Sequence, residues 1–369
     1  MSGNSNTIQS RLAPSFLPAT AVLEMTYRCN HACLFCSCPW FNEQGDFARL
    51  PEMTVEEWKA LIRRLMDMGV CDLAFTGGEP LLKEGLFDIM EFAASCETEH
   101  IETVDGSLQS RRAPPSLHLL SNGTAMTREV LEFCRQLNIQ LSMSLPGLST
   151  FREHTGGGDP DVILRWFQEA KAMGGFAVVA GVTVTRRNLF ELYETISAAL
   201  LAGADQLLMN RFLPGGRGIR HAAELMLSKE QIPRMLDTAE EALREAGRKG
   251  SVGTELPKCV VEKNKYRQLQ VGTRCSAGLS FFAIDPSGYV RACNHSPVRL
   301  VHFREIEKLK ADPYWRRFTQ KDYLPASCSG CAMANDCDGG CREAAHICGG
   351  ALDAPDPCLA ASVSQGPPS

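Results

Sequence analysis

Three cysteines lie close together near the N-terminus, at Cys29, Cys33 and Cys36, with the spacing C-x3-C-x2-C. A four-iron, four-sulfur cluster normally takes four thiolates, so three thiolates would leave one iron with an open coordination site. That open site is the chemically useful feature of this spacing. The alternative is a zinc site, for which Cys38 or His31 would supply the fourth ligand.

Seven further cysteines lie toward the C-terminus of the 369-residue chain, which has sixteen in all. They are Cys275, Cys293, then Cys328, Cys331, Cys337 and Cys341 with the spacing C-x2-C-x5-C-x3-C, and Cys358. The polar start of the chain lacks the features of a secretory signal, so lasting disulfides are not expected. We expect these thiolates to be metal ligands that hold together a segment too poor in apolar residues to fold alone. Paired zinc sites are one form that such a segment could take.

A turn with the sequence Thr76-Gly77-Gly78-Glu79-Pro80 follows a predicted strand. Two glycines allow the backbone to approach a ligand closely, and the neighbouring carboxylate can pair with an ammonium group. The turn therefore predicts a binding loop for a ligand that carries an amine.

Alternating strands and helices must position these residues. Short apolar runs predict six strands, at Val22–Thr26, Asp72–Thr76, Leu117–Ser121, Gln140–Leu145, Val178–Thr185 and Gln206–Asn210. Amphipathic stripes between them predict helices, which indicates an α/β fold with repeated β/α units around a parallel sheet. We interpret this as a partial (β/α)6 TIM-type barrel, whose chemistry gathers at the C-terminal ends of the strands.

Local sequence signals predict where two of the helices begin and where one insertion lies. Thr54 and Glu57 form a capping box before one helix, and Ser228 is the expected N-cap of another. The polar stretch Glu97–Ser116 joins a helix to a strand, so it is interpreted as a surface insertion on the opposite rim of the barrel. The expected division is an extension at 1–20, the barrel at 21–250, a loop-rich unit with a bridging region at 251–358 and a disordered tail at 359–369.

The N-terminal motifs resemble those of the radical S-adenosylmethionine (SAM) enzymes. The resemblance implies that the open iron chelates SAM and that one electron cleaves SAM to a 5'-deoxyadenosyl radical. It also implies a set of SAM contacts: Phe35 against the adenine, the segment Gly77, Gly78 and Glu79 at the amino group, Asn122 and Ser144 at the ribose and carboxylate, and Arg152 as a partner of the SAM carboxylate.

The seven C-terminal cysteines resemble a SPASM domain, and both resemblances together span roughly residues 21–358. They imply three 4Fe-4S clusters, one that binds SAM and two auxiliary. The outer auxiliary cluster would be held by Cys328, Cys331, Cys337 and Cys358, and the inner one by Cys275, Cys293 and Cys341. The fourth ligand of the inner cluster stays open between Cys259, Cys348, a non-cysteine group and none.

The resemblance implies an enzyme that abstracts hydrogen from a ribosomal peptide or a protein, to install a thioether or carbon-carbon cross-link or to oxidise a side chain. A small-molecule or haem-like cofactor precursor is the alternative substrate. Sulfatase maturation is disfavoured, because relatives of that type carry an aspartate directly after the cysteine matching Cys293, whereas Asn294 cannot serve as a base. No catalytic residue is assigned.

The expected partners are the substrate and a flavodoxin or ferredoxin that supplies electrons. The first strand begins near Ala21, which leaves no room for an N-terminal leader-recognition domain, so a separate leader-recognition protein is a further expectation. A net charge of -5 argues against nucleic acid as a partner, and no apolar run is long enough to cross a membrane. The sequence thus predicts a cytoplasmic enzyme.

Overall fold

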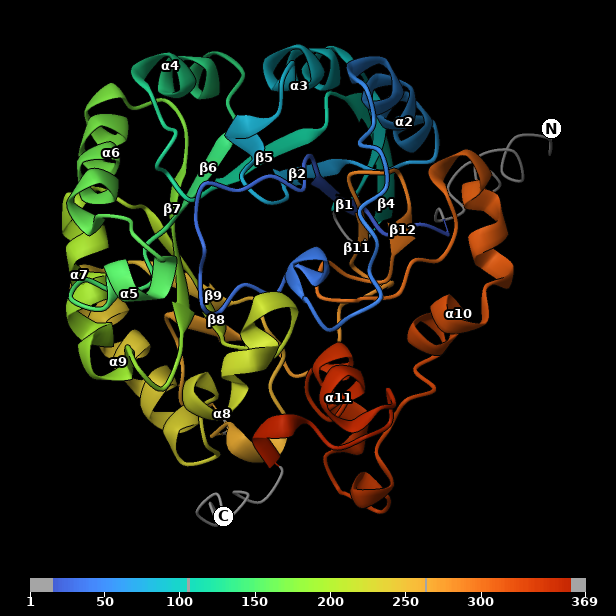
Figure 1. Cartoon of the computed structure of the whole chain (residues 1–369). Coiled ribbons are helices and arrows are strands. Elements are labelled where there is room, and N and C mark those ends of the chain that lie inside the picture. Colours follow the sequence, from blue (N-terminus) through green and yellow to red (C-terminus); the bar gives the residue numbers. More distant parts are fainter. Residues whose placement is uncertain (1–15, 105–106, 263, 360–369) are drawn as a thin grey trace.

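The computed structural model describes residues 16–104, 107–262 and 264–359, and within them a curved, mostly parallel sheet forms the centre of the molecule. Its strand order is β10-β9-β8-β7-β6-β5-β2-β1-β11-β12. The six predicted strands are confirmed, with ends that differ by at most two residues: β1 Thr20–Glu24, β2 Asp72–Thr76, β5 Ser116–Ser121, β6 Gln140–Ser144, β7 Val178–Val184 and β8 Gln206–Arg211. Figure 1 shows these strands curving around a central space with helices outside, as expected for a partial barrel.

Four strands that the sequence did not predict extend this sheet at both ends. Beyond β8 lie β9 (Lys249–Val252) and β10 (Leu269–Val271), both parallel to their neighbours. On the other side, β11 (Phe281–Ile284) pairs in parallel with β1, and β12 (Val290–Arg291) pairs antiparallel to β11. The C-terminal cysteine segment therefore contributes strands directly to the sheet of the barrel (Figure 1).

Helices cover the outer face of the sheet and shape the C-terminal segment. The α-helices are α2 Val55–Asp67, α3 Leu86–Ser95, α4 Arg128–Gln136, α5 Phe151–Thr155, α6 Pro160–Met173, α7 Leu192–Ala202, α8 Ala222–Leu225, α9 Gln231–Ala246, α10 Pro313–Thr319 and α11 Arg342–Gly349. Short 3-10 helices are η1 Pro39–Phe41, η2 Pro80–Leu82, η3 Leu189–Glu191, η4 Gly216–His221, η5 Lys258–Val260, η6 Phe303–Ala311, η7 Ala326–Cys328, η8 Ala334–Asp336 and η9 Pro357–Leu359.

The two predicted helix starts have different outcomes. The capping box of α2 is confirmed, because the Thr54 side chain accepts from the Glu57 N–H while the Glu57 carboxylate accepts from the Thr54 N–H. The Ser228 cap is only half formed. Helix α9 begins at Gln231, and the Ser228 hydroxyl donates to the Glu230 carboxylate instead of accepting from a helix N–H. The Gln231 side chain does accept from the Ser228 N–H at 2.9 Å, as in a capping box.

The predicted insertion at Glu97–Ser116 contains a β-hairpin of its own. Strands β3 (Thr98–Val104) and β4 (Ser107–Ala113) form a separate two-stranded antiparallel sheet between the end of α3 and the start of β5. Since β5 begins there, the hairpin lies at the N-terminal side of the strands, away from the predicted site.

The predicted disordered tail lies almost wholly outside the described residues, as does most of the N-terminal extension. Among the residues that are described, none of the helices combines the length and the apolar character that crossing a membrane would require.

Candidate functional site

A cavity of about 360 Å³ opens at the C-terminal ends of the strands. Its lining comes from the loops after β1, β2, β5 and β6, from the ends of β7 and β8, and from residues 253–254 and 294–295. Seven of the residues predicted from the sequence meet there: Cys29, Cys33, Phe35, Cys36, Gly78, Asn122 and Ser144. Parallel strands thus gather side chains that lie up to 115 positions apart in the sequence.

The three N-terminal thiols lie within electrostatic reach of one another. Burial, together with the neighbouring Cys36 and Cys29, raises the pKa of Cys33, and the Arg217 guanidinium acts in the opposite direction. A hydrogen bond from the Cys38 thiol lowers the pKa of Cys36. Because metal ligands must be thiolates, the Arg217 charge favours the liganded form of this loop.

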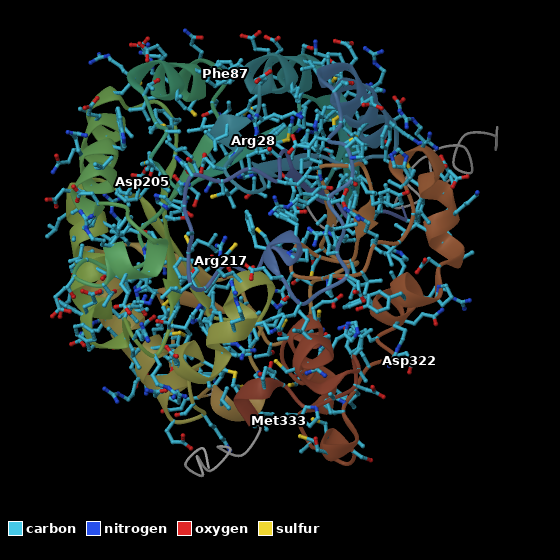
Figure 2. All side chains as sticks on the ribbon, viewed as in Figure 1. Arg28, Phe87, Asp205, Arg217, Asp322 and Met333 are labelled. Atoms are coloured by element: carbon cyan, nitrogen blue, oxygen red, sulfur yellow. The ribbon has the colours of Figure 1, made fainter. Side chains whose placement is uncertain are left out.

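Arg217 also contacts the loop that carries the three cysteines. Its Nη1 donates to the carbonyl oxygen of Cys33 at 3.2 Å, and its guanidinium lies 4.7 Å from the centre of the Phe41 ring. Figure 2 shows Arg217 toward the centre of the ring of strands, whereas Phe87 and Met333 lie at its periphery. The sequence gives no signal for Arg217, because a lone arginine far from the cysteines is usually a solvated surface residue.

Within the described residues, no group of three or more His, Cys, Asp or Glu side chains converges as the ligands of a single metal ion would. The thiolates that hold an iron-sulfur cluster bind separate irons, so they stand further apart than the ligands of one ion.

The two glycines of the turn after β2 are explained by the protein's own backbone. Gly77 has φ +136°, and a Cβ there would lie 2.9 Å from the carbonyl oxygen of Thr26. A Cβ on Gly78 would lie only 2.0 Å from the carbonyl oxygen of Arg28. The glycines therefore allow the β2 turn to pack against the chain just before Cys29. The expectation that they allow close approach to a ligand stays a prediction.

Glu79 lies beneath the cavity and is fully buried. Its carboxylate accepts from the Ser121 hydroxyl at 2.8 Å, the Asn122 N–H at 2.8 Å and the Leu81 N–H at 3.2 Å. Burial raises its pKa, and these donors act in the opposite direction. The carboxylate thus joins the turn after β2 to the turn after β5.

Asn122 extends this connection to the cysteine loop. Its Nδ2 donates to Asn30 Oδ1 at 2.7 Å and lies 3.9 Å from Cys29 Sγ, while its Oδ1 accepts from the Thr124 N–H at 2.9 Å. The Cys29 thiol is therefore approached by a side-chain amide in addition to the His31 N–H at 3.5 Å.

The remaining predicted SAM contacts lie in different surroundings. Phe35 lines the cavity with its ring 6.0 Å from that of His154, and Ser144 is exposed at the end of β6. Arg152 lies on α5 with an exposed side chain and is not among the residues that line the cavity.

The C-terminal cysteines form two groups. Cys275, Cys293 and Cys341 are buried, and burial followed by nearby carboxylates raises the pKa of each. Cys341 also raises the pKa of Cys275 and of Cys293, so the three thiols lie close together. Cys259 instead interacts electrostatically with Cys337, Cys328 and Cys358, so it stands with the predicted outer set. The Cys337 sulfur accepts from the N–H groups of Lys258 at 3.2 Å and Gly339 at 3.3 Å.

Buried polar atoms near these thiols have no hydrogen-bond partner among the described residues. They include Arg211 Nε and His295 Nε2, and both residues line the cavity. Burial lowers the pKa of His295 to about 4, so its ring is neutral at physiological pH. Buried polar groups are almost always paired, so thiols and orphaned polar atoms together fit a cavity that takes bound groups.

Comparisons with known proteins agree with this geometry. Residues 23–199 match the model of the Radical SAM superfamily. The PqqA peptide cyclase of Xanthomonas euvesicatoria pv. vesicatoria (strain 85-10) is 25% identical over 335 residues, which is 88% of this chain and 83% of that protein. The PqqA peptide cyclase of Rhodopseudomonas palustris (strain ATCC BAA-98 / CGA009) is 24% identical over 363 residues, with 94% and 88% covered.

Solved structures share the fold. Streptococcus suis SuiB bound to its precursor peptide SuiA has a TM-score of 0.68 at 15% identity, covering 97% of this chain and 79% of SuiB. The protein anSMEcpe with bound AdoMet has a TM-score of 0.64 at 16% identity, covering 88% and 90%.

Proposed function

We propose that this chain is a radical SAM enzyme that cross-links a ribosomal peptide, because residues 23–199 match the model of the Radical SAM superfamily. The superfamily implies SAM and a 4Fe-4S cluster. The supporting observation is the single cavity that joins three thiols, the turn at Gly78 and the turn at Asn122. The choice of a peptide rests on similarity to PqqA peptide cyclases over 88% of the chain.

We assign Cys29, Cys33 and Cys36 as the ligands of the SAM-binding cluster. These three residues would hold the cluster, and the cluster with SAM and one electron from the donor would supply a 5'-deoxyadenosyl radical for hydrogen abstraction from the peptide. The chain's own contribution is to hold the three thiols in place through the backbone contact of Gly78 and the charge of Arg217.

The other SAM contacts are assigned with one refinement. Phe35, Asn122 and Ser144 face the cavity and would touch SAM directly. Glu79 would act through the turn whose N–H and hydroxyl groups it binds, because its carboxylate already has three donors. Arg152 would reach SAM only if α5 moved, since its side chain is exposed outside the cavity lining.

The C-terminal unit, residues 251–358, would bind two auxiliary clusters. Cys328, Cys331, Cys337 and Cys358 would hold the outer cluster, while Cys275, Cys293 and Cys341 would hold the inner one. Because Cys259 lies with the outer set and Cys348 is exposed, neither is favoured as the fourth ligand of the inner cluster. Electrons would come from a flavodoxin or ferredoxin, and a separate protein would present the leader of the peptide.

Asn294 favours cross-linking over sulfatase maturation. It lines the cavity, where an aspartate would be placed to take a proton, and an amide cannot do so at neutral pH. The product of a cross-link formed by oxidation is lighter than the peptide by two hydrogen atoms.

Anaerobic purification followed by SAM and a strong reductant tests the proposal. Three clusters predict about twelve irons per chain, and 5'-deoxyadenosine should form. The triple change Cys29→Ala, Cys33→Ala and Cys36→Ala should abolish 5'-deoxyadenosine and leave about eight irons. The matched control changes Cys71 and Cys96, which lie outside both cysteine groups, and should keep full activity.

The peptide step is tested with short peptides encoded beside the gene, whose products are weighed by mass spectrometry. SAM cleavage that survives the triple change would refute the assignment of the thiols. SAM cleavage by the wild type without a change in the mass of any such peptide would refute the choice of a peptide substrate.

A further inference from the structure

A second cavity, of about 500 Å³, adjoins the cavity that Cys29, Cys33 and Cys36 line. Four segments form its walls: residues 37–47 directly after the cysteine triad, η4, residues 295–299 after β12, and α11. The barrel and the C-terminal cysteine segment therefore line it together. We call this second cavity the side chamber and the first one the thiol cavity.

The two cavities meet at Ser37 and His295, which line both of them. His295 is 8% exposed, and its Nε2 has no hydrogen-bond partner among the described residues. Buried polar atoms are almost always paired. The junction thus holds an unsatisfied hydrogen-bonding atom, as expected where a bound molecule extends from one cavity into the other.

Gly215 lies at this junction, and space rather than backbone conformation explains why it is a glycine. Its φ of 176° is extended and lies outside the left-handed region that favours glycine. A Cβ on Gly215 would lie 2.7 Å from His295 Cε1 and 3.2 Å from Ser37 Cβ. A side chain at this position would therefore press on both residues that the two cavities share.

The proposed reaction needs room for two molecules. Pockets for a small molecule or a cofactor have volumes of about 300–1,000 Å³. The thiol cavity, at about 360 Å³, is therefore large enough for SAM but leaves little space for a peptide as well. The side chamber supplies the additional space directly beside it.

Apolar side chains line the side chamber from both parts of the chain. Phe47 and Ile219 come from the barrel, whereas Pro297 and Ile347 come from the C-terminal cysteine segment. Binding pockets typically combine such a lining with a few polar groups that fix the orientation of the ligand. The chamber therefore suits an apolar side chain, with His295 as a polar contact.

The charges of the lining favour a positive occupant. Arg299 is paired with Asp285, and His346 lies 3.4 Å from the Glu343 carboxylate. Asp46 also lines the chamber, but it has no hydrogen-bond or ion-pair partner among the described residues. An occupant with a basic group would supply the missing opposite charge.

We propose that the side chamber binds the segment of the substrate peptide next to the residue that reacts, and that this segment carries an apolar and a basic residue. Gly215 leaves open the passage through which the peptide reaches SAM. The inference rests on the proposed function, because it requires a peptide substrate. Ile219, Ile347 and Asp46 would then determine which peptide the enzyme accepts.

The test uses the reconstituted holoenzyme and, as the probe, a peptide encoded beside the gene whose mass the wild type changes. Ile219→Trp and Ile347→Trp fill the chamber, and Gly215→Ala narrows the passage. Each should lower kcat/KM for the peptide by at least about tenfold, which corresponds to about 1.4 kcal/mol. Formation of 5'-deoxyadenosine without peptide should continue, because none of the three residues lines the thiol cavity. The matched control is Leu201→Trp on α7, where the side chain is 88% exposed.

Asp46→Lys tests the charge of the chamber. It should lower kcat/KM for the probe peptide and raise it for a version of that peptide in which the basic residue is replaced by glutamate. The same kcat/KM for both peptides in wild type and in Asp46→Lys would overturn the preference for a basic residue.

Wild-type kcat/KM in both tryptophan variants would overturn the side chamber as the peptide site. If Gly215→Ala stops forming 5'-deoxyadenosine without peptide at full iron content, the passage serves SAM and its role for the peptide is overturned. A wild type that cleaves SAM but changes the mass of no peptide would instead refute the proposed function, so the two failures are distinguishable.

Discussion

Gly78→Ala is the sharpest test of how the β2 turn positions the cysteine loop. A Cβ at Gly78 would lie 2.0 Å from the carbonyl oxygen and 2.6 Å from the carbonyl carbon of Arg28, which directly precedes Cys29. A carbon and an oxygen that are not bonded approach to about 3.3 Å, so the two backbones must separate by about 1.3 Å. Neither can yield easily, because the Gly78 N–H donates to Thr26 and the Glu79 N–H donates to Arg28, both at 2.8 Å.

The expected consequence is larger for chemistry than for stability. Overpacking of this kind costs about 1–3 kcal/mol, which a chain of this size tolerates. A displacement of about 1 Å in a reacting site costs about 100-fold in rate. We therefore expect Gly78→Ala to fold, to keep the iron of the proposed C-terminal clusters and to form 5'-deoxyadenosine at least about 100-fold more slowly.

The assay is anaerobic 5'-deoxyadenosine formation, with iron content and circular dichroism measured on the same preparation. Gly272→Ala is the matched control, since a Cβ there meets only Glu255 Cγ at 4.0 Å. If Gly78→Ala cleaves SAM at the wild-type rate, the β2 turn does not position the thiols and the reasoning fails. If it loses activity together with its circular dichroism signal, the loss is one of folding.

Two further changes concern stability. Thr54→Ala removes the side-chain half of the capping box with Glu57 and should lower the free energy of unfolding by about 1 kcal/mol, measured by chemical denaturation. Thr54→Ser should restore the wild-type value. Equal free energies of unfolding for all three proteins would show that the capping box contributes nothing to stability. Burial raises the pKa of Glu52, but hydrogen bonds from the Thr26 hydroxyl and the Tyr27 N–H and the charge of Lys83 outweigh it, so the pKa lies below 4.5 in the folded chain. The stabilisation by this carboxylate is therefore present above pH 4.5 and lost as the pH falls through the folded value. Glu52→Gln should be less stable than wild type at about pH 7, and the difference in the free energy of unfolding should shrink as the pH falls below 4.5; a difference that widens toward acid would contradict the sign.

The barrel strands could be predicted because each carries its own apolar run, as in Leu117–Ser121 and Gln206–Asn210, where every second residue is buried. Strand β11 could not, although its residues Phe281–Ile284 are apolar, because it pairs with β1 about 260 positions earlier and lies among cysteines. The hairpin β3–β4 was missed for the opposite reason. It carries a polar sequence without an apolar face, so nothing in its pattern distinguishes a strand from a loop.

The residues of the candidate site likewise fall into those that a local sequence pattern predicts and those that it does not. Cysteine spacing and the Gly77-Gly78 turn are local patterns, and the structure brings both to one cavity. The predicted role of the glycines was incomplete, because it named only a ligand. Their nearest neighbour is the backbone of residues 26–28, which only the fold brings close. Arg211 and Arg217 carry no local pattern at all. Their importance follows from where β8 ends and η4 begins in space.

Two buried ion pairs connect the barrel to the C-terminal cysteines, and their cost explains what they are for. Arg291 of β12 binds Glu24 of β1, and Arg211 of β8 binds Asp356, with every one of these side chains at most 3% exposed. Apolar side chains of similar volume would stabilise the fold equally well or better. What an apolar contact lacks is direction: it tolerates sliding, whereas a bidentate pair fixes distance and orientation. Each arginine also places a charge close to C-terminal cysteines, Cys293 for Arg291 and Cys341 with Cys358 for Arg211. The two ion pairs therefore hold these thiols at a defined position relative to the cavity, which electron transfer to the proposed auxiliary clusters would require.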